Sequence, residues 1–271
     1  MARWASLIDK RRSEHPAILL DAGGFCNPAQ GKATVFDIDY FFEGMRMIGY
    51  DAAGVGAAEI RFGRERLLER VDQAGFRLLS ANIHDKRGDG MLGAEYTVIR
   101  AGGRRTITGT KGAVKIGVFS VALPVLIHEI DPAIPKYYDV LDPRIAALAA
   151  VSALKEKGCD LIVALSYQGW SGSLELAESI EGIDIVINGK REHNRPTGEK
   201  VGSTMVVDTG IRRISLTEVL VEWAGGNPRI RVLESGPQAK AMKGRADLLE
   251  LEKKYELELR NRGIKDAREG S

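Results

Sequence analysis

The sequence predicts an α/β protein built from packed mixed sheets with helices on the outside. Three observations support this prediction. Segments with apolar residues at helical spacing alternate with short strand-like runs, the middle of the chain is rich in strand-like segments, and crossover helices occur on both sides of that middle. A chain of 271 residues with 44% hydrophobic residues is also long enough to bury a full core.

The first part of the chain alternates helices with strands. The predicted elements are a helix over 4–13, a strand over 17–21, a helix over 37–48, a strand in MIGYDAA, a helix over 62–74 and a strand over 77–81. The segment GVGAAEIRFG, residues 54–63, follows the strand in MIGYDAA and predicts a glycine-flanked turn that leads into a helix. Such turns are where folds usually present polar side chains to a substrate.

The middle and the second half supply most of the strands. Residues 95–100 and 107–121 predict antiparallel strands around a turn at 110–112, and residues 144–157 predict a helix that ends at Gly158. The remaining elements are a βαβ-like unit (strand 160–165, helix 174–180, strand 183–188) and strands in TMVVDTG, SLTEVLVEW and RIRVL.

A domain boundary is predicted near Gly236–Pro237. Residues 1–236 form one domain, and residues 237–271 carry a highly charged helix. Its apolar positions have helical spacing; they are Leu248, Leu251, Tyr255 and Leu259. This face can lie on its own domain, continue toward a further domain or bind a partner.

Charge and hydropathy exclude some classes of partner and leave the compartment open. The net charge is +2, from 39 basic and 37 acidic residues, so no bulk field points to nucleic acid. No apolar run approaches the roughly 18–20 residues that span a bilayer. The N-terminus has no signal-peptide pattern. The predicted location is periplasmic if the N-terminus was trimmed and cytoplasmic otherwise.

The two cysteines are predicted to be free thiols. Cys26 follows the end of a predicted strand, whereas Cys159 precedes one. In parallel strands these are opposite ends, on the order of 17 Å apart. A disulfide needs Cα atoms within about 7 Å.

Six loop segments, taken in order, carry a family resemblance. They are LLDAGGFCNP, GYDAAGVGAAEIRFG, LLSANI, GCDLIVALSYQGW, GIDIVINGKREHN and TMVVDTG. The chain resembles the calcineurin-like metallophosphoesterases, and within them the 5′-nucleotidase and UDP-sugar hydrolase branch, from about Arg3 to about Trp223. The resemblance implies a four-layer α/β/β/α sandwich. An earlier Asp-x-His strand of the family pattern has no counterpart in this sequence.

The resemblance also implies that the metal ligands of the family are missing. Members of the family hold two divalent ions at the ends of their strands with Asp, Asn and His, and the ions activate water and bind phosphate oxygens. The matching positions of this chain are Gly24, Ala57, Ala58, Tyr167, Lys190 and Glu192. Glycine and alanine offer no donor atom, so no cofactor is expected. A rearranged metal site remains an alternative; its candidate ligands are Glu59, Glu192, His193, Asp21 and Asp208.

The leading functional hypothesis is a degenerate 5′-nucleotidase-like protein that binds a small anionic molecule or a protein partner. The candidate ligand-binding residues lie in strand-end loops; they are Asn82, Tyr167, Lys190, Arg191 and His193. The basic loop can equally be a solvated turn. Gln168 and Trp170 beside Tyr167 can form a stacking wall or simply pack in the core.

A second hypothesis is a thiol-dependent redox protein that uses Cys26. This residue lies two positions after Gly24, and a cation from Lys190 or Arg191 would lower its pKa if it lay close. The chain is similar to degenerate relatives that carry cysteine or selenocysteine around the former metal site. The alternative is an inert loop cysteine. A hydrolase with a rearranged metal site is the third hypothesis.

Overall fold

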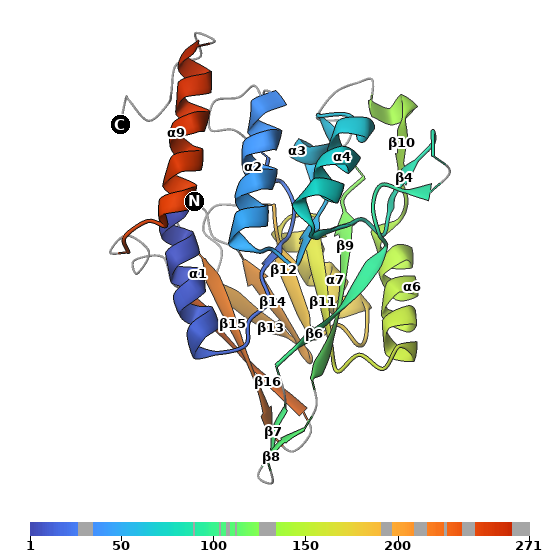
Figure 1. Cartoon of the computed structure of the whole chain (residues 1–271). Helices are drawn as coiled ribbons and strands as arrows, with labels where there is room; N and C mark the ends of the chain where they lie inside the picture. Colours follow the sequence, from blue (N-terminus) through green and yellow to red (C-terminus); the bar gives the residue numbers. More distant parts are fainter. Residues whose placement is uncertain are drawn as a thin grey trace.

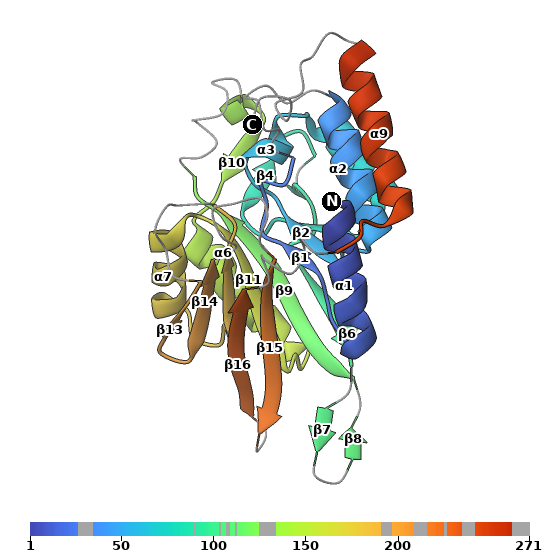
Figure 2. The same ribbon diagram turned by 90° about the vertical axis from the view of Figure 1, so that its left-hand side faces the viewer.

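The computed structural model describes most of the chain. The described residues are 1–26, 35–88, 90–102, 104–106, 109–111, 113–124, 134–190, 197–208, 216–224, 227–234 and 242–261. Within them, two sheets pack face to face with helices on both outer sides (Figure 1). Figure 2 shows α1, α2 and α9 on one side of the sheets and α6 and α7 on the other.

The first sheet is short and parallel. Its order is β1 (Leu20–Asp21), β2 (Ala52–Gly54) and β3 (Arg77–Leu79). The helices that connect and cover these strands are α1 (Ala2–Glu14), α2 (Val35–Ile48), the single turn α3 (Ala57–Ile60) and α4 (Arg64–Ala74). Because the strands are parallel, their carboxyl ends meet at one edge of the sheet.

The second sheet is mixed and larger. Its order among the described residues is β13 (Gly198–Val201), β14 (Thr204–Asp208), β12 (Ile185–Asn188), β11 (Leu161–Tyr167), β9 (Val114–Ala122) and β6 (Tyr96–Ala101). The four inner strands run parallel, and β13 and β6 pair antiparallel at the two edges. The helices α6 (Pro143–Glu156) and α7 (Trp170–Ser179) cover its outer face.

Alternation along the strands separates the apolar layers. Val118 of β9 faces the layer between the two sheets, where it joins Leu79 of β3, and its neighbour Phe119 faces α6 and joins Leu154. A third apolar layer joins the first sheet to its helices, with Phe42 of α2 as a fully buried member. The four-layer α/β/β/α architecture predicted from the resemblance is confirmed.

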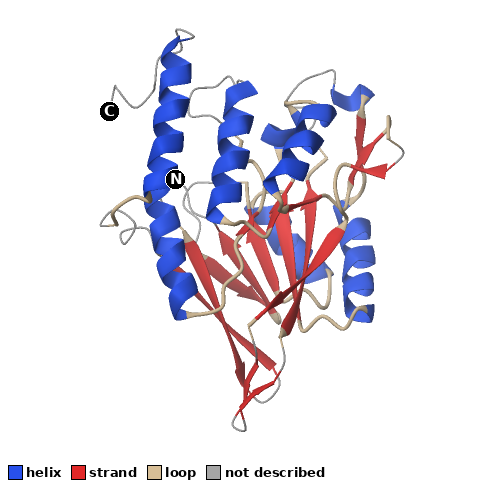
Figure 3. Ribbon diagram, in the orientation of Figure 1, coloured by secondary structure: helices blue, strands red, loops and turns tan. Residues whose placement is uncertain are grey.

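Among the described residues, three smaller β units flank the two sheets (Figure 3). They are β4 (Ile83–Asp85), β5 (Gly90–Met91) and β10 (Tyr138–Val140), which follows the 3₁₀ turn η1 (Ile134–Lys136); the hairpin of β7 (Arg104–Thr106) and β8 (Gly109–Lys111); and the pair of β15 (Thr217–Ala224) and β16 (Asn227–Glu234). Apolar side chains of β15 and β16 pack against the layer between the two sheets.

Local signals set the helix ends where the sequence predicted them. In α6 the carboxylate of Asp142 accepts hydrogen bonds from the backbone N–H groups of Arg144 and Ile145, and Pro143 takes the first helical position. Gly158 follows the helix with φ +67°, as expected of a residue that ends a helix. The βαβ-like unit is also confirmed, since β11 and β12 are parallel and joined by α7.

The turn predicted at 110–112 is wrong. Thr110 and Lys111 belong to β8, where Thr110 pairs with Arg105 of β7, and Gly112 lies outside the described residues. The predicted turn instead falls on a strand, because residues 104–106 and 109–111 pair with each other as a separate antiparallel unit. The main strand pairing, β6 antiparallel to β9, follows the prediction.

The C-terminal helix α9 (Ala246–Asn261) lies across α1 and α2. Leu248 is fully buried against an apolar cluster from α1, and the N-terminal ammonium group donates a hydrogen bond of 2.8 Å to Glu252. Tyr255 stacks on Tyr40 of α2 with ring centres 4.1 Å apart. This helix therefore covers its own domain. The boundary at Gly236–Pro237 remains a prediction, because residues 235–241 lie outside the described ones.

Candidate functional site

The candidate site lies where the parallel strands of both sheets end. The loop after β1 meets the loop after β2, and both meet the end of β11. A Cβ atom built on Gly23 would lie 2.9 Å from the backbone nitrogen of Gly56, and one built on Gly54 would lie 2.5 Å from the hydroxyl of Ser120 in β9. Side chains larger than hydrogen have no room at these positions, so Gly23 allows the two loops to approach closely and Gly54 allows the two sheets to do so.

The ring of Tyr167 fills the space between the two loops. A Cβ atom built on Gly24 would lie 2.8 Å from Cε2 and 3.0 Å from the hydroxyl oxygen of Tyr167, and one built on Gly56 would lie 2.9 Å from Cε2. Gly24 also has φ +77°, which L side chains rarely adopt. The glycine at position 24 and the tyrosine at position 167 are therefore sterically linked.

Glu59 links the same loops through its side-chain carboxylate. Its carboxylate is fully buried and accepts hydrogen bonds from the backbone N–H groups of Gly24 (2.9 Å), Cys26 (3.0 Å) and Gly56 (2.8 Å). Burial raises the pKa of Glu59, and the hydrogen bonds oppose that rise. Both carboxylate oxygens are committed to the backbone, so Glu59 serves as a structural clamp in this arrangement.

A buried polar network connects the ends of β11, β12 and β14. The hydroxyl of Ser173 in α7 donates to Ser166 at 2.9 Å and lies 3.3 Å from Oδ1 of Asn188. The amide of Asn188 donates to Oδ2 of Asp208 at 2.8 Å and to the carbonyl of Lys190 at 2.9 Å. Ser166, Ser173, Asn188 and Asp208 are all buried. The Asp208 carboxylate is thus engaged inside the protein.

These residues do not fit a pair of divalent metal ions. Gly24, Ala57 and Ala58 have no donor atoms, and the ring of Tyr167 packs directly over Gly24. Within the described part of the chain, no three His, Cys, Asp or Glu side chains are grouped so that they could hold a metal ion. Glu192 and His193, which the rearranged-site alternative needs, lie outside the described residues.

Cys26 lies in a setting opposite to the one that the redox hypothesis requires. Its side chain is fully buried in the apolar layer between the first sheet and its helices. Burial raises the pKa of this thiol well above its usual range, and the carboxylates of Glu59, Asp21 and Asp37 raise it further. The described surroundings of Cys26 therefore do not support a cation-activated thiolate. Both cysteines are free, as predicted.

We expect thiol reagents to distinguish the two cysteines. In a Cys159→Ser variant, the remaining Cys26 should react with a disulfide reagent about 100-fold more slowly in the folded protein than in denaturant, because reaction requires local opening. The matched Cys26→Ser variant keeps the half-exposed Cys159, whose pKa burial also raises while Lys115 and Lys157 oppose the rise, and it should react faster. Rapid labelling of folded Cys26 at neutral pH would contradict the buried-thiol structure.

The side chain of Asn82 forms hydrogen bonds with backbone groups of the protein. Its side-chain amide donates to the carbonyls of Ala122 (2.8 Å) and Leu141 (3.0 Å), and its Oδ1 accepts from the N–H of Ala122 (2.9 Å). The side chain is fully buried. It ties the loop after β3 to the end of β9, so the ligand-binding prediction for Asn82 is not supported by its contacts.

The remaining predicted residues fall into two groups. Trp170 begins α7 and is buried in the layer between α7 and the sheet, so it offers no stacking wall. Lys190 follows β12, is half-buried and forms no ion pair with any described residue. Arg191 and His193 lie outside the described residues. Among the predicted ligand-binding residues that the structure describes, Tyr167 and Lys190 lie at strand ends. A ligand-binding role is compatible with both positions.

Comparison with known proteins agrees with this arrangement of strands and loops. No family model matches the chain. The 5′-nucleotidase of Vibrio parahaemolyticus is 30% identical over 174 residues, which cover 62% of this chain and 29% of that protein. Among solved structures, the sulfate thiohydrolase SoxB of Thermus thermophilus has a TM-score of 0.82 at 20% identity, covering 96% of this chain and 47% of that one. The calcineurin-like phosphoesterase YfkN of Bacillus subtilis has a TM-score of 0.76 at 19% identity, covering 95% and 88%.

The chain has the fold of the calcineurin-like phosphoesterases and is similar in sequence to curated 5′-nucleotidases. Three of the curated relatives are Vibrio proteins named 5′-nucleotidase, at 30–31% identity. The match spans about 30% of the length of the Vibrio relatives. Among the described helices of this phosphoesterase-fold chain, none is long and apolar enough to cross a membrane.

Two parts of the site escaped sequence reasoning. Glu59 was considered only as a metal ligand, although its place three residues after Gly56 at the start of a helix is the spacing at which a glutamate reaches back to the backbone. The network around Ser166 and Asn188 depends on residues from three elements, and short polar residues at strand ends gave no distinctive signal.

Proposed function

We propose that this chain is a non-hydrolytic member of the 5′-nucleotidase branch that binds an anionic ligand without the two-metal reaction of the family. The observation that carries the proposal is the contact of the Tyr167 ring with Gly24 and Gly56. This contact places an aromatic ring beside the position where the family pattern has a metal-bridging aspartate. Replacement of the donor residues by Gly24, Ala57 and Ala58 supports the same conclusion.

The absence of the family's metal-ligating side chains fits a site that holds no metal ions. A cluster of buried carboxylates without metal ions would be costly through desolvation and mutual repulsion. Among the described residues, the carboxylates near the site are bonded to protein groups, as Glu59 is to three N–H groups and Asp208 is to Asn188. These bonds stabilise the site without a bound cation. A domain that only binds a ligand needs such stability, whereas a two-metal hydrolase has its metal ions to offset the charge.

Anion binding is the part of the proposal that Lys190 supports. This lysine lies at the end of β12, is half-buried, and has no carboxylate partner among the described residues. A fixed ammonium group at the edge of a site recognises phosphate or carboxylate through charge and hydrogen bonds. A protein partner with an acidic loop offers the same chemistry. The predicted periplasmic or cytoplasmic location stays a prediction.

A hydrolysis assay tests the proposal directly. The protein is incubated with manganese and then with AMP, UDP-glucose or p-nitrophenyl phosphate, beside the Vibrio parahaemolyticus 5′-nucleotidase as a positive control. Release of phosphate from AMP and p-nitrophenyl phosphate, and of UMP from UDP-glucose, should equal that of a blank without protein. Metal-dependent release above the blank would overturn the non-hydrolytic function.

A stability assay tests the binding half. Phosphate or AMP at about 100 times its Kd should raise the free energy of unfolding by about 2.7 kcal/mol without metal, because a ligand that binds only the folded state stabilises it. A Lys190→Ala variant should lose this stabilisation, while the exposed Lys200→Ala control should keep it. Equal stabilisation of both variants, or of neither protein, would contradict binding at the strand ends.

A further inference from the structure

An open basic groove runs along β6, far from the strand-end site. Its volume is about 470 Å³, and four cationic side chains line it: Arg77, Arg100, Lys115 and Lys157. No carboxylate is among the described residues that line it. Lys115 lies near the start of β9, whereas Ala122 at the other end of β9 belongs to the strand-end site, about 20 Å away at about 3.3 Å per residue.

No described carboxylate neutralises the positive charges in the groove. In the part of the chain that the structure describes, none of the four cations forms an ion pair with a carboxylate. The Lys115 ammonium donates to the carbonyl of Lys157 at 3.2 Å, and the Lys157 ammonium lies 5.6 Å from the centre of the Tyr96 ring. A concave surface that carries charge of one sign concentrates the field and attracts oppositely charged partners.

The groove lies over the free edge of a strand. Tyr96, Thr97 and Val98 all line it, although successive residues of a strand point to opposite faces. A groove that runs along the edge of β6 touches all three. Among the described strands, β6 is the last one of its sheet, and beyond a bridge at Ala94 no described strand pairs with its other side. Such an edge presents unpaired N–H and C=O groups.

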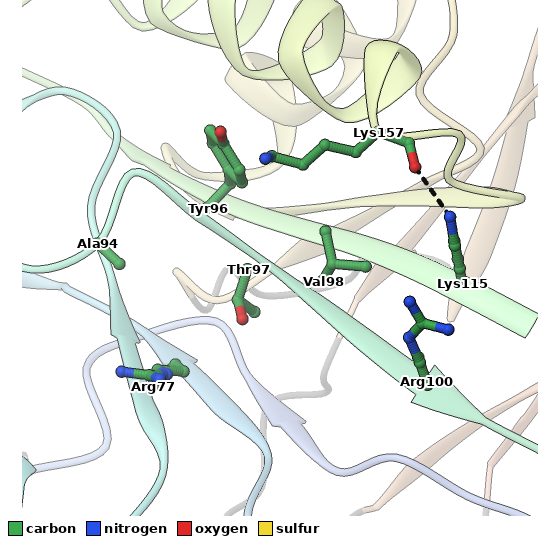
Figure 4. A pocket seen from close by; sticks show the side chains of 8 residues that line it. All are labelled: Arg77, Ala94, Tyr96, Thr97, Val98, Arg100, Lys115 and Lys157. Atoms are coloured by element: carbon green, nitrogen blue, oxygen red, sulfur yellow. Dashed lines mark hydrogen bonds between the residues drawn. The ribbon is translucent and has the colours of Figure 1, made fainter.

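The cations lie on both sides of this edge. Arg100 is opposite Lys115 in the register of β6 and β9, so both lie on the face of the sheet that carries Tyr96 and Val98. Figure 4 shows Arg100 and Lys115 together at one end, Lys157 beside Tyr96 at the other, and Arg77 across β6 on the side of Thr97. The charges are therefore spread along the strand.

We propose that this groove binds an extended acidic peptide segment of a partner protein, which adds to the sheet as a strand beside β6. The backbone of the segment would pair with the free edge, as in other cases of strand addition. Its side chains would alternate between Arg77 on one side and Arg100 and Lys115 on the other, so consecutive acidic residues fit better than alternating ones. A single small anion would favour cations that converge on one point, which these do not.

Binding of a labelled hexaglutamate peptide at low salt tests the proposal. Six residues match the length of β6 (Tyr96–Ala101). Fluorescence anisotropy should show saturable binding that weakens as the salt concentration rises. The double variant Arg77→Glu, Arg100→Glu should bind the peptide at least about tenfold more weakly. The matched control is Lys200→Glu, which reverses an exposed charge on β13, the opposite edge strand of the same sheet.

Two probes separate strand addition from attraction of any polyanion. A hexaglutamate peptide with alternate backbone nitrogens methylated keeps the charge but loses the donors for a strand pair, and it should bind at least about tenfold more weakly. Inorganic pyrophosphate and AMP should not displace the peptide at equal charge concentration. Absence of peptide binding, equal binding of the methylated peptide, displacement by pyrophosphate or AMP, or equal loss in Lys200→Glu would each overturn the proposal.

Discussion

A Glu59→Ala variant is expected to lose about 4 kcal/mol in the free energy of unfolding, among the largest effects of any single change in this domain. The substitution leaves the N–H groups of Gly24, Cys26 and Gly56 without an acceptor. Each buried donor left unpaired costs about 1–3 kcal/mol. Urea unfolding of wild type and variant, followed by circular dichroism, measures the difference.

The control for this variant is Glu65→Ala. Glu65 lies in the first turn of α4, close in sequence, but it is exposed and has no ion pair among the described residues. Its loss should change the free energy of unfolding by about 0.5 kcal/mol or less. If Glu59→Ala were as mild as Glu65→Ala, the three hydrogen bonds to Glu59 would not hold the loops together.

The pH dependence gives an independent test of the same carboxylate. Burial raises the pKa of Glu59 above its ordinary value of 4.5, so the folded protein keeps the proton to higher pH than the unfolded chain does. The retained proton on Glu59 stabilises the folded protein fully below pH 4.5. This stabilisation is lost as the pH rises through the pKa of Glu59 in the folded state. Wild type should therefore lose stability relative to Glu59→Gln across this window. A difference that stays constant or grows with pH would contradict the raised pKa.

A Gly24→Ala variant is expected to cost about 3 kcal/mol, most of it through Tyr167. About 1 kcal/mol comes from the backbone, because Gly24 has φ +77°. The rest comes from the clash between the new Cβ atom and the ring of Tyr167, 2.8 Å from Cε2. In a Tyr167→Ala background the clash is gone, and Gly24→Ala should cost only about 1 kcal/mol, a coupling of about 2 kcal/mol.

The matched control is Gly75→Ala. Gly75 ends α4 with φ +73°, nearly the value at Gly24, and a Cβ atom there would meet nothing within 4 Å. It should cost about 1 kcal/mol with or without Tyr167. If Gly24→Ala and Gly75→Ala showed the same cost and no coupling to Tyr167, the ring would not occupy the position over Gly24.

The fold was largely predictable from the sequence because its signals are local. Helical spacing in 37–48 and 144–157 corresponds to α2 and α6, and the strand runs before Gly54 and Ser166 correspond to β2 and β11. Short edge elements were harder to predict. Strands such as β5 and β10 have two or three residues, so they carry almost no periodicity, and tertiary pairing alone defines them.

The candidate site was only partly predictable. The sequence shows that donor atoms are missing at Gly24, Ala57 and Ala58, but not that Tyr167 packs over the gap. The sequence places Cys26 after a strand end but does not show that its side chain is buried in the apolar layer between the first sheet and its helices. Side-chain direction within a loop depends on contacts between distant elements, and one sequence does not encode these as a local pattern.

The measurement that tests the central claim most directly is the metal content of the purified protein. The chain is incubated with excess manganese or zinc, desalted and analysed by inductively coupled plasma mass spectrometry, with the Vibrio parahaemolyticus 5′-nucleotidase treated in parallel. Because Tyr167 lies over Gly24 and the donors at positions 57 and 58 are absent, far less than one ion should remain per chain. Retention of about one or two ions per chain would contradict the account and restore a metal-dependent phosphoesterase.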